Sequence, residues 1–336
     1  MTTIALDAMG SDRAPQAEIE GALLAARAYG MRVLLVGPQD LIQRQLQGQD
    51  ARGLPIETVH ASEVIGAEEA PVKALRRKLD SSIRVATLLP QDGRADGMVT
   101  AGNTGAAMAA AKMELGALPG VDRPALASVF PTKKGSAAVM VDVGANVDCR
   151  PQHLQQFAIM GEVYYRVMFG VTRPRVGLLS IGEEASKGNE VVRETHRRLL
   201  ESTLSFDFVG NVEGRDVYGG DVHVVVCDGF IGNVALKISE GTAEAIVAML
   251  KEALSGSLAS QLGAALSRQA YDELKKRVDY SEYGGAPLLG VKGVCVICHG
   301  RSNANAIKNA IRMAAGLSSG RINEKIEREL ALVAAG

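Results

Sequence analysis

The sequence predicts an α/β fold in which a mostly parallel sheet is flanked by helices on both faces and carries a protruding helical hairpin. A short apolar run, then glycine with aspartate or asparagine, then a helical stretch recurs six times, and residues 240–283 alone depart from this pattern. Continuous β-branched runs are typical of strands that are buried on both faces. Strands that alternate with helices indicate a parallel sheet between two helical layers.

The six strand–turn–helix units follow one another along the whole chain. They span residues 3–26, 96–112, 137–161, 175–199, 222–241 and 294–314. Further apolar runs predict strands at 31–37, 56–60 and 124–130. We therefore expect residues 1–239 and 284–336 to form a single α/β catalytic domain.

Residues 240–283 have helical apolar spacing in two segments that are separated near Gly256. The fifteen residues between Glu252 and Arg268 carry no charge. We favour a helical hairpin that packs against a second subunit. The alternative is a neutral tip that touches a bilayer, flanked by Lys251, Arg268 and the basic run at 273–277. The two interpretations are compatible, because a dimer could present two tips.

Composition excludes several classes of protein. The 336 residues are 47% apolar and have a formal net charge of −1, without the basic excess of a nucleic-acid-binding protein. No run approaches the ~18 apolar residues of a spanning helix, and four cysteines without a signal peptide favour reduced thiols in a cytoplasm. Cys295 and Cys298 form a C-x-x-C on a predicted strand, where they would point to opposite faces. We therefore expect neither a metal nor a cofactor.

Polar turns follow the predicted strands. In a parallel sheet, ligands bind beyond the carboxyl ends of the strands, so these turns predict one polar cleft. The side chains involved are Asp7, Asp12, Asn103, Thr104, Asp142, Asn146, Glu183, Glu184, Lys187, Asn189, Asp228, Asn233, His299 and Asn303, with Gly10, Gly102, Gly105, Gly229, Gly232 and Gly300 beside them. Each residue taken alone is equally typical of a helix cap or a tight turn.

The sequence carries no dinucleotide fingerprint, P-loop or serine elbow, so covalent catalysis is not indicated. The turns suit a reaction whose nucleophile is a bound anion such as inorganic phosphate. The turn at residues 102–105 opens a helix, where N–H groups and the helix dipole favour negative charge. Lys187 in "GEEASKGNE" is the best cation for that anion, and its alternative is a surface lysine in a capped turn.

A set of ordered motifs resembles one family over essentially the whole chain. The motifs are "ALDAMGSD" (5–12), "SSIRVA" (81–86), "VTAGNTGAAM" (99–108), "RPALASVFPT" (123–132), "VDVGANVDCRPQHLQQFAIMG" (141–161), "LLSIGEEASKGNE" (178–190), "VVCDGFIGNVALKISEG" (225–241), "YGGAPLLGVKG" (283–293) and "HGRSN" (299–303). Together they resemble the acyl-acyl-carrier-protein:phosphate acyltransferases of bacterial phospholipid synthesis. Ser11 stands where this family usually has a second glycine.

The resemblance implies a fold akin to phosphotransacetylases and isocitrate-dehydrogenase-like enzymes. It also implies transfer of a long-chain acyl group from acyl-carrier protein to inorganic phosphate by a homodimer at the inner membrane face. The catalytic residues it favours are Lys187, Asn189, Asn103 and Asn233. Phosphate would lie at the Asn103–Thr104 turn near Lys187, and the thioester carbonyl would face N–H groups of Gly229–Gly232. The three aspartates Asp7, Asp12 and Asp228 would orient loops.

Two other functions stay open from the residues. One is a decarboxylating dehydrogenase that uses Asp142, Asp148 and Arg150, and the other is a non-catalytic scaffold that binds a carrier protein or lipid. An acidic carrier could dock on a basic surface, although such residues also commonly form a solvated helix face. The basic residues concerned are Arg76, Arg77, Lys78, Arg193, Arg197 and Arg198.

Overall fold

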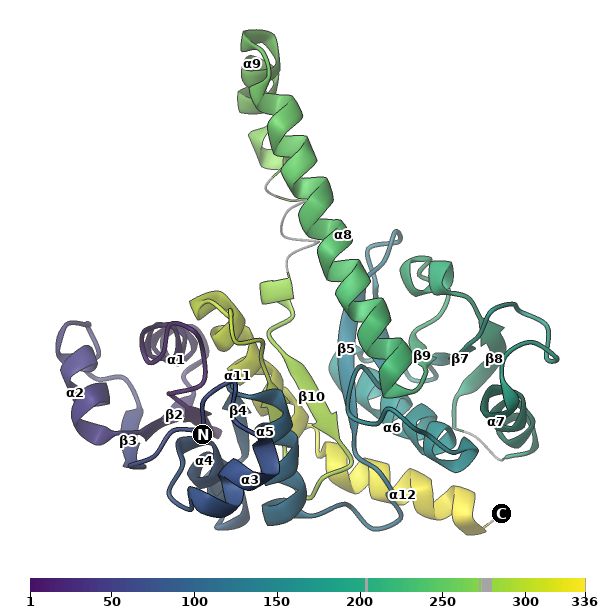
Figure 1. The fold of residues 1–336 in the computed structure, drawn as a ribbon, viewed down its shortest axis with the longest axis horizontal. Coiled ribbons are helices and arrows are strands. Elements are labelled where there is room, and N and C mark those ends of the chain that lie inside the picture. The colour runs from purple at the N-terminus through teal and green to yellow at the C-terminus, as the bar shows by residue number, and fades with distance from the viewer. Residues whose placement is uncertain (203–204, 272, 274–279, 336) are drawn as a thin grey trace.

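The computed structural model describes residues 1–202, 205–271, 273 and 280–335. Within these residues one sheet of eleven strands runs through the body of the protein in the order β3-β2-β1-β4-β11-β10-β5-β6-β9-β7-β8 (Figure 1). Seven of its ten neighbouring pairs are parallel, which confirms the predicted mostly parallel sheet.

The sheet consists of two parallel halves joined by two antiparallel strands. The first half contains β3 (Ile56–His60), β2 (Arg32–Gly37), β1 (Thr3–Asp7), β4 (Gly97–Thr100) and β11 (Cys295–Ile297). The second half contains β6 (Ala137–Val141), β9 (Val224–Val226), β7 (Arg175–Leu179) and β8 (Asp207–Val212). Between them lie β10 (Ala286–Leu289) and β5 (Ala125–Pro131), which pair antiparallel with each other and with their outer neighbours.

The three additional strands predicted at 31–37, 56–60 and 124–130 are confirmed to within one residue as β2, β3 and β5. Two strands were not predicted. The strand β8 is an edge strand whose residues are mostly exposed or half-buried, and β10 has only four residues and includes Pro287. The sequence of β8 lacks the continuous apolar run by which buried strands are recognised, and a proline within a short run argues against a strand at β10.

Helices cover both faces of the sheet, and the alternation of the strands divides the core between them. Ile4 and Leu6 of β1 belong to one cluster, whereas Ala5 between them belongs to the other. The first cluster is covered by α1 (Gln16–Tyr29), α2 (Gln39–Gln47), α6 (Pro151–Phe169), α7 (Glu190–Glu201), α11 (Ala304–Ser319) and α12 (Ile322–Ala335). The second is covered by α3 (Pro71–Arg77), α4 (Ser82–Gln91), α5 (Thr104–Ala110) and the π-helical turn η1 (Ala111–Leu115).

The C-x-x-C pair is divided in the same way. Cys298 packs in the first cluster and Cys295 in the second, so the two thiols lie on opposite faces as predicted. Both side chains are buried, and Cys295 Sγ lies 3.2 Å from Met98 Sδ. The pair is therefore explained by core packing.

A long helix, α8 (Gly229–Ser255), rises out of the body and carries α9 (Leu258–Leu266) at its far end (Figure 1). The break between them at Gly256 confirms the two predicted helical segments. The predicted boundary at 239/240 falls inside α8, which is continuous from Gly229. Apart from Glu273, the expected basic run at 273–277 lies outside the described residues.

Two short 3-10 helices complete the fold: η2 (Gly214–Tyr218) precedes β9, and η3 (Tyr280–Glu282) precedes β10. A search of the described helices finds none that is both long and apolar enough to cross a membrane.

Candidate active site

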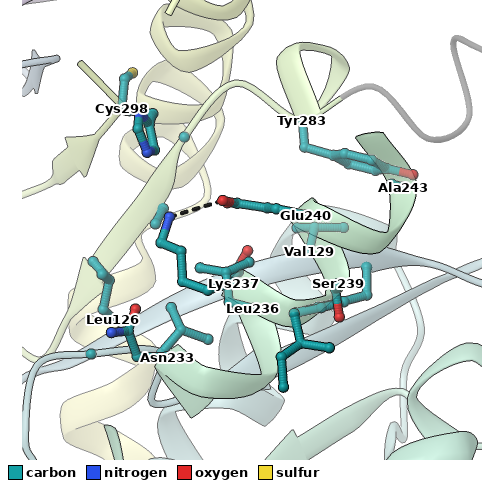
Figure 2. A pocket seen from close by; sticks show the side chains of 18 of the residues that line it. Leu126, Val129, Asn233, Leu236, Lys237, Ser239, Glu240, Ala243, Tyr283 and Cys298 are labelled. Carbon is teal, nitrogen blue, oxygen red and sulfur yellow. Dashed lines mark hydrogen bonds and ion pairs between the residues drawn. The ribbon is translucent and has the colours of Figure 1, made fainter. Parts of the chain in front are cut away.

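A cavity of about 850 Å³ lies between α8, strand β5 and the turns that follow β4, β6 and β11 (Figure 2). Most of its wall is apolar, and its polar side chains come from segments far apart in the sequence. These include Thr104 after β4, Asn233 and Lys237 of α8, and His299 after β11. Gly105 and Gly144 line the same cavity. The turns after β4, β6 and β11 therefore converge on one cavity, as the sequence predicts.

Four of the predicted polar site residues are helix N-caps. The side-chain oxygen of each accepts a backbone N–H bond from the third residue on, which satisfies a donor that the helix itself leaves unpaired. The caps are Asn103 on α5 (3.0 Å), Asn189 on α7 (2.9 Å), Asp228 on α8 (2.8 Å) and Asn303 on α11 (2.9 Å). The recurrent asparagine or aspartate at these four positions is thus explained by local helix starts.

Both the oxygen and the nitrogen of the Asn103 side-chain amide form hydrogen bonds within the protein. Its Oδ1 caps α5, and its Nδ2 donates to the carbonyl oxygens of Ala67 at 2.9 Å and Glu69 at 3.2 Å. The side chain therefore holds the turn after β4 against the loop before α3, and it has no further donor for a ligand. Thr104 and Gly105, the next two residues, are the ones that face the cavity.

Asp7 acts inside the protein, not at the cavity surface. It is 2% exposed, and its Oδ2 accepts the Thr100 hydroxyl at 2.7 Å. The Thr100 oxygen in turn accepts the Gly102 N–H at 3.0 Å. Burial raises the pKa of Asp7, although hydrogen bonds from Ser82 and Thr100 oppose that shift. Asp7 thereby fixes the backbone of the turn that leads into α5.

The turn after β1 packs directly on the turn after β4. A Cβ placed on Gly10 would lie 2.4 Å from the Gly102 nitrogen, so only glycine fits there. The Asp12 N–H donates to the Gly300 carbonyl at 2.8 Å, which ties the same turn to the one after β11. Ser11 donates its backbone N–H to Glu18 Oε1 at 2.7 Å. These contacts explain "MGSD" as the support beneath two other turns.

The turn after β6 is organised around Asp142. Its carboxylate accepts N–H bonds from Leu126, Gly144, Ala145 and both nitrogens of Asn146, at 2.7–3.1 Å. Asn146 also donates to the Pro124 carbonyl at 2.8 Å. Burial raises the pKa of Asp142, and the hydrogen bonds oppose that shift. Asp142 and Asn146 therefore shape the cavity wall through Gly144 and Leu126.

The two glycines that begin α8 are explained by packing against this turn. A Cβ on Gly232 would lie 1.9 Å from the Asp142 carbonyl oxygen, and one on Gly229 would lie 2.8 Å from the Asn146 backbone. Their N–H groups are also occupied, because Gly229 donates to Asn146 O at 2.7 Å and Gly232 donates to Asp228 O at 2.9 Å. The expected use of these two N–H groups for a thioester carbonyl does not agree with this geometry.

The charged end of the cavity centres on a residue that the sequence analysis did not select. Lys237 Nζ lies 2.8 Å from Glu240 Oε2, as Figure 2 shows, and Arg301 lies 3.8 Å from the same oxygen. Burial lowers the pKa of His299, and the positive charges of Lys237 and Arg301 lower it further. The available signal was the i, i+4 spacing of Asn233 and Lys237, which places both on one helix face.

The turn after β7 has different surroundings. Glu183, Glu184, Lys187 and Asn189 are all exposed, and Glu183 pairs with Arg215 at 3.1 Å. The Glu184 carbonyl accepts Asn211 Nδ2 at 2.8 Å, which anchors the turn to β8. Lys187 and Asn189, both within the described chain, are not among the residues that line the cavity. This turn is therefore separate from the turns that line the cavity.

Comparison with known proteins identifies the family. The model of a family described as "Fatty acid synthesis protein" matches residues 2–325. The chain belongs to this family. It is 62% identical over 98% of its length to a protein named phosphate acyltransferase from Koribacter versatilis, and covers 93% of that protein. It is 55% identical to a protein of the same name from Acidobacterium capsulatum, with 98% of each chain covered.

Among solved structures, the fold is similar to a phosphotransacetylase from Streptococcus pyogenes. The two chains align with a TM-score of 0.61 at 17% identity, covering 95% of this chain and 94% of the other. This likeness confirms the predicted phosphotransacetylase-like fold.

Proposed function

We propose that this protein transfers a long-chain acyl group from acyl-carrier protein to inorganic phosphate, which yields an acyl phosphate for phospholipid synthesis. Membership of the fatty acid synthesis family and more than 50% identity to proteins named phosphate acyltransferase support this reaction. The observation that carries the proposal is one cavity that joins an apolar groove to a polar end holding Lys237, Asn233 and His299.

In this reaction a phosphate oxygen attacks the thioester carbonyl carbon, the C–O bond to phosphate forms, and the C–S bond breaks. The released thiolate has an ordinary pKa of about 8.5, so it leaves without a dedicated acid. Phosphate binds beside Lys237 Nζ at the start of α5, where Thr104 and Gly105 face the cavity. Asn233 and the neutral His299 ring donate hydrogen bonds to the negative charge that develops on the carbonyl oxygen.

His299 suits the role of a donor. Its Nδ1 faces the Arg301 N–H at 3.4 Å, which favours the tautomer with the proton on Nε2. Because its pKa is lowered, the ring is neutral at physiological pH. The remaining site residues hold these groups in place: Asp7, Gly10, Asp12, Gly102, Asn103, Asn146, Asp228, Gly229, Gly232, Gly300 and Asn303.

Lys187 attracts phosphate from solution in this proposal. Its side chain is exposed and has no ion pair among the described residues, although Glu183 and Glu184 lie beside it in the turn. Exposed charges act mainly by steering an anion and not by holding it tightly. Asn189 maintains the start of α7, and with it the turn that carries Lys187.

The test is to incubate the protein with palmitoyl-acyl-carrier protein, with and without inorganic phosphate, and to measure free carrier thiol and acyl phosphate. Equal, phosphate-dependent release of both is expected. Thiol release that ignores phosphate would indicate a thioesterase. Carrier binding without any release would favour the scaffold alternative, and reduction of a nicotinamide cofactor with a hydroxy acid would favour the dehydrogenase.

The acidic carrier docks through basic residues in this proposal. Residues that already pair with a carboxylate are less available for docking, so the ion pairs show which basic residues to test first. Lys78 pairs with Glu69 at 2.6 Å, and Arg197 and Arg198 both pair with Glu194, at 2.7 and 2.9 Å. Arg76 on α3 and Arg193 on α7, which reaches the Gly188 carbonyl, carry no such pair among the described residues. A Michaelis constant for the carrier that rises with salt, less steeply in Arg76→Ala, is the expected result.

A second copy of the chain covers the exposed apolar stripe of α8. Phe230, Val234 and Ile238 recur every four residues, and 61%, 43% and 63% of their surfaces are exposed. Such a stripe on one helix face supports a packed helix interface. Sedimentation should report a dimer for the native protein, and Val234→Glu should shift it toward monomer. A monomeric native protein would remove this part of the proposal.

The tip of the hairpin contacts the inner face of the cytoplasmic membrane. Leu258, Leu262 and Leu266 lie on one face of α9 and are 67–89% exposed. Residues 253–267 carry no charge, which supports shallow insertion into a bilayer surface. Flotation with anionic vesicles should retain the native protein and lose Leu262→Ser, whereas Ser260→Ala serves as a control. Equal flotation of the native protein and both variants would contradict membrane contact by this face.

A further inference from the structure

The apolar part of the cavity extends along one face of α8. Leu236, Ala243, Val247 and Leu250 all line it, and their spacings of seven, four and three residues keep the side chains on one side of a helix. From Asn233 to Leu250 the helix advances about 25 Å at 1.5 Å per residue. The polar and apolar regions are thus two ends of one continuous space.

Figure 2 shows the direction of this space. Asn233 and Leu126 lie at one end of the view, whereas Ala243 and Tyr283 lie together at the other, beyond Lys237 and Glu240. The opposite wall is formed by β5, where Phe130 is 3% exposed and packs edge-on against Tyr218, with ring centroids 6.0 Å apart. The groove therefore has an aromatic floor, and it passes between Ala243 and Tyr283 on its way toward Leu250.

We infer that the acyl chain of the substrate lies in this groove, with its carbonyl beside Lys237 and the middle of its chain between Ala243 and Tyr283, so that position 243 selects chain length. The inference rests on the proposed function, because the occupant of the polar end decides what occupies the groove. Alanine is smaller than the α8 side chains that line the groove beyond it, Ile246, Val247 and Leu250. It leaves room for a chain beside the Tyr283 ring.

Ala243→Phe tests this assignment by narrowing the groove where it passes Tyr283. Each methylene kept out of an apolar site costs about fourfold in binding. Excluding two or three methylenes predicts that kcat/KM for palmitoyl-carrier falls about 15- to 60-fold, whereas octanoyl-carrier is used as before. The matched control is Ala245→Phe, because position 245 is exposed, does not line the groove and lies about 200° around the helix. It should leave the ratio of the two substrates unchanged.

A milder variant and a second measurement distinguish a changed groove from a variant that merely folds poorly. Ala243→Val should shift the same ratio by a few-fold and in the same direction. The chain contains no tryptophan, so Tyr283→Trp introduces a single indole beside Ala243. Palmitoyl-carrier protein brominated at the middle of its chain should quench that indole, unlike unbrominated palmitoyl-carrier. Ala245→Trp should show no such difference.

The outcomes separate this inference from the proposed function. An unchanged palmitoyl-to-octanoyl ratio in both position-243 variants, or binding without quenching at position 283, would overturn the assignment of the groove. Quenching without phosphate-dependent transfer would retain the acyl groove and overturn the proposed reaction. A lowered palmitoyl ratio together with quenching would support both.

Discussion

The turn after β4 and the turn after β7 have the same kind of sequence and different surroundings. Each contains glycine and an asparagine that caps the next helix, at 3.0 Å for Asn103 and 2.9 Å for Asn189. The first is packed between the turn after β1 and the loop before α3 and opens onto the cavity, whereas the second is exposed and anchored to β8. A capped turn is therefore a local structure, and its neighbours decide whether it belongs to a site.

The largest expected contrast is between the two lysines. Lys237→Ala removes the cation of the cavity and should lower kcat about 10²- to 10³-fold, the usual cost of one preorganised group at a developing charge. Lys187→Ala should raise the Michaelis constant for phosphate about tenfold or less, because an exposed charge acts through a screened field. Steady-state kinetics with phosphate as the varied substrate measure both.

Lys251→Ala is the control for Lys237, since Lys251 lies on the same helix but does not line the cavity. Circular dichroism should show the same helix content in all three variants. If Lys187→Ala costs as much in kcat as Lys237→Ala, the turn after β7 belongs at the reaction centre, and the separation of the two turns is lost.

The next contrast concerns Gly10, through which the turn after β1 packs on the turn after β4. Gly10→Ala places a methyl group 2.4 Å from the Gly102 nitrogen, so two backbones must move apart. We expect the free energy of unfolding to fall by about 1–3 kcal/mol, as for other overpacked sites, and activity to fall with it. Gly214→Ala is the control, because a Cβ there meets nothing within 4 Å. Equal denaturation midpoints for the two variants would argue against the packed turn.

Glu18, whose carboxylate accepts the Ser11 N–H, makes the stability of the turn after β1 depend on pH. Burial raises the pKa of Glu18 to about 7, whereas its ordinary value is 4.5. Between these values the folded protein keeps a proton that the unfolded chain has lost, so the free energy of unfolding decreases as the pH rises. The slope for one such group is about 1.4 kcal/mol per pH unit, and it levels off above pH 7.

Glu18→Gln should remove that contribution, because the amide oxygen can still accept the Ser11 N–H without carrying a charge. The remaining slope comes partly from Glu162, whose pKa burial also raises to about 7. Glu183→Gln in the exposed turn is the control and should leave the profile unchanged. Urea titrations between pH 5 and 8 measure the difference, and identical slopes in native protein and Glu18→Gln would contradict the assignment.

The sequence determines what is local and leaves open what is distant. Nine of the eleven described strands, the capped turns and the break at Gly256 are visible in runs of neighbouring residues, and they are confirmed. The convergence of the turns after β4, β6 and β11 depends on the antiparallel strands β10 and β5, and β10 is a four-residue strand containing proline. The packing of Gly10 on Gly102 joins residues 92 positions apart, and no spacing along the chain indicates it.

Lys237 was not predicted for a related reason. Glycine and asparagine mark the loops that follow the strands, whereas Lys237 lies inside a helix, two turns beyond its start. It faces the cavity because Gly232 and Gly229 let α8 lie directly on the turn after β6. Its role therefore depends on a contact between backbones, and a search of the turns alone does not reveal it.

The smallest contrast compares the two caps themselves. Asn103→Asp keeps the oxygen that caps α5 but loses the amide donor to the carbonyls of Ala67 and Glu69. Asn189→Asp keeps the only side-chain bond that Asn189 makes within the described chain. The first should lower the free energy of unfolding by about 1 kcal/mol, because the exposed Ala67 carbonyl and the half-buried Glu69 carbonyl lose their donor, and the second by about zero.

Chemical denaturation of the two aspartate variants measures this difference, and Asn103→Ala and Asn189→Ala calibrate it, since both lose a cap worth about 1 kcal/mol. Both aspartate variants keep the cap. Any loss of stability in Asn103→Asp beyond that in Asn189→Asp is therefore due to the tether between Asn103 and the loop at 66–69. Equal values for Asn103→Asp and Asn189→Asp would mean that the tether contributes nothing. The two turns would then differ only in what they face, not in how firmly they are held.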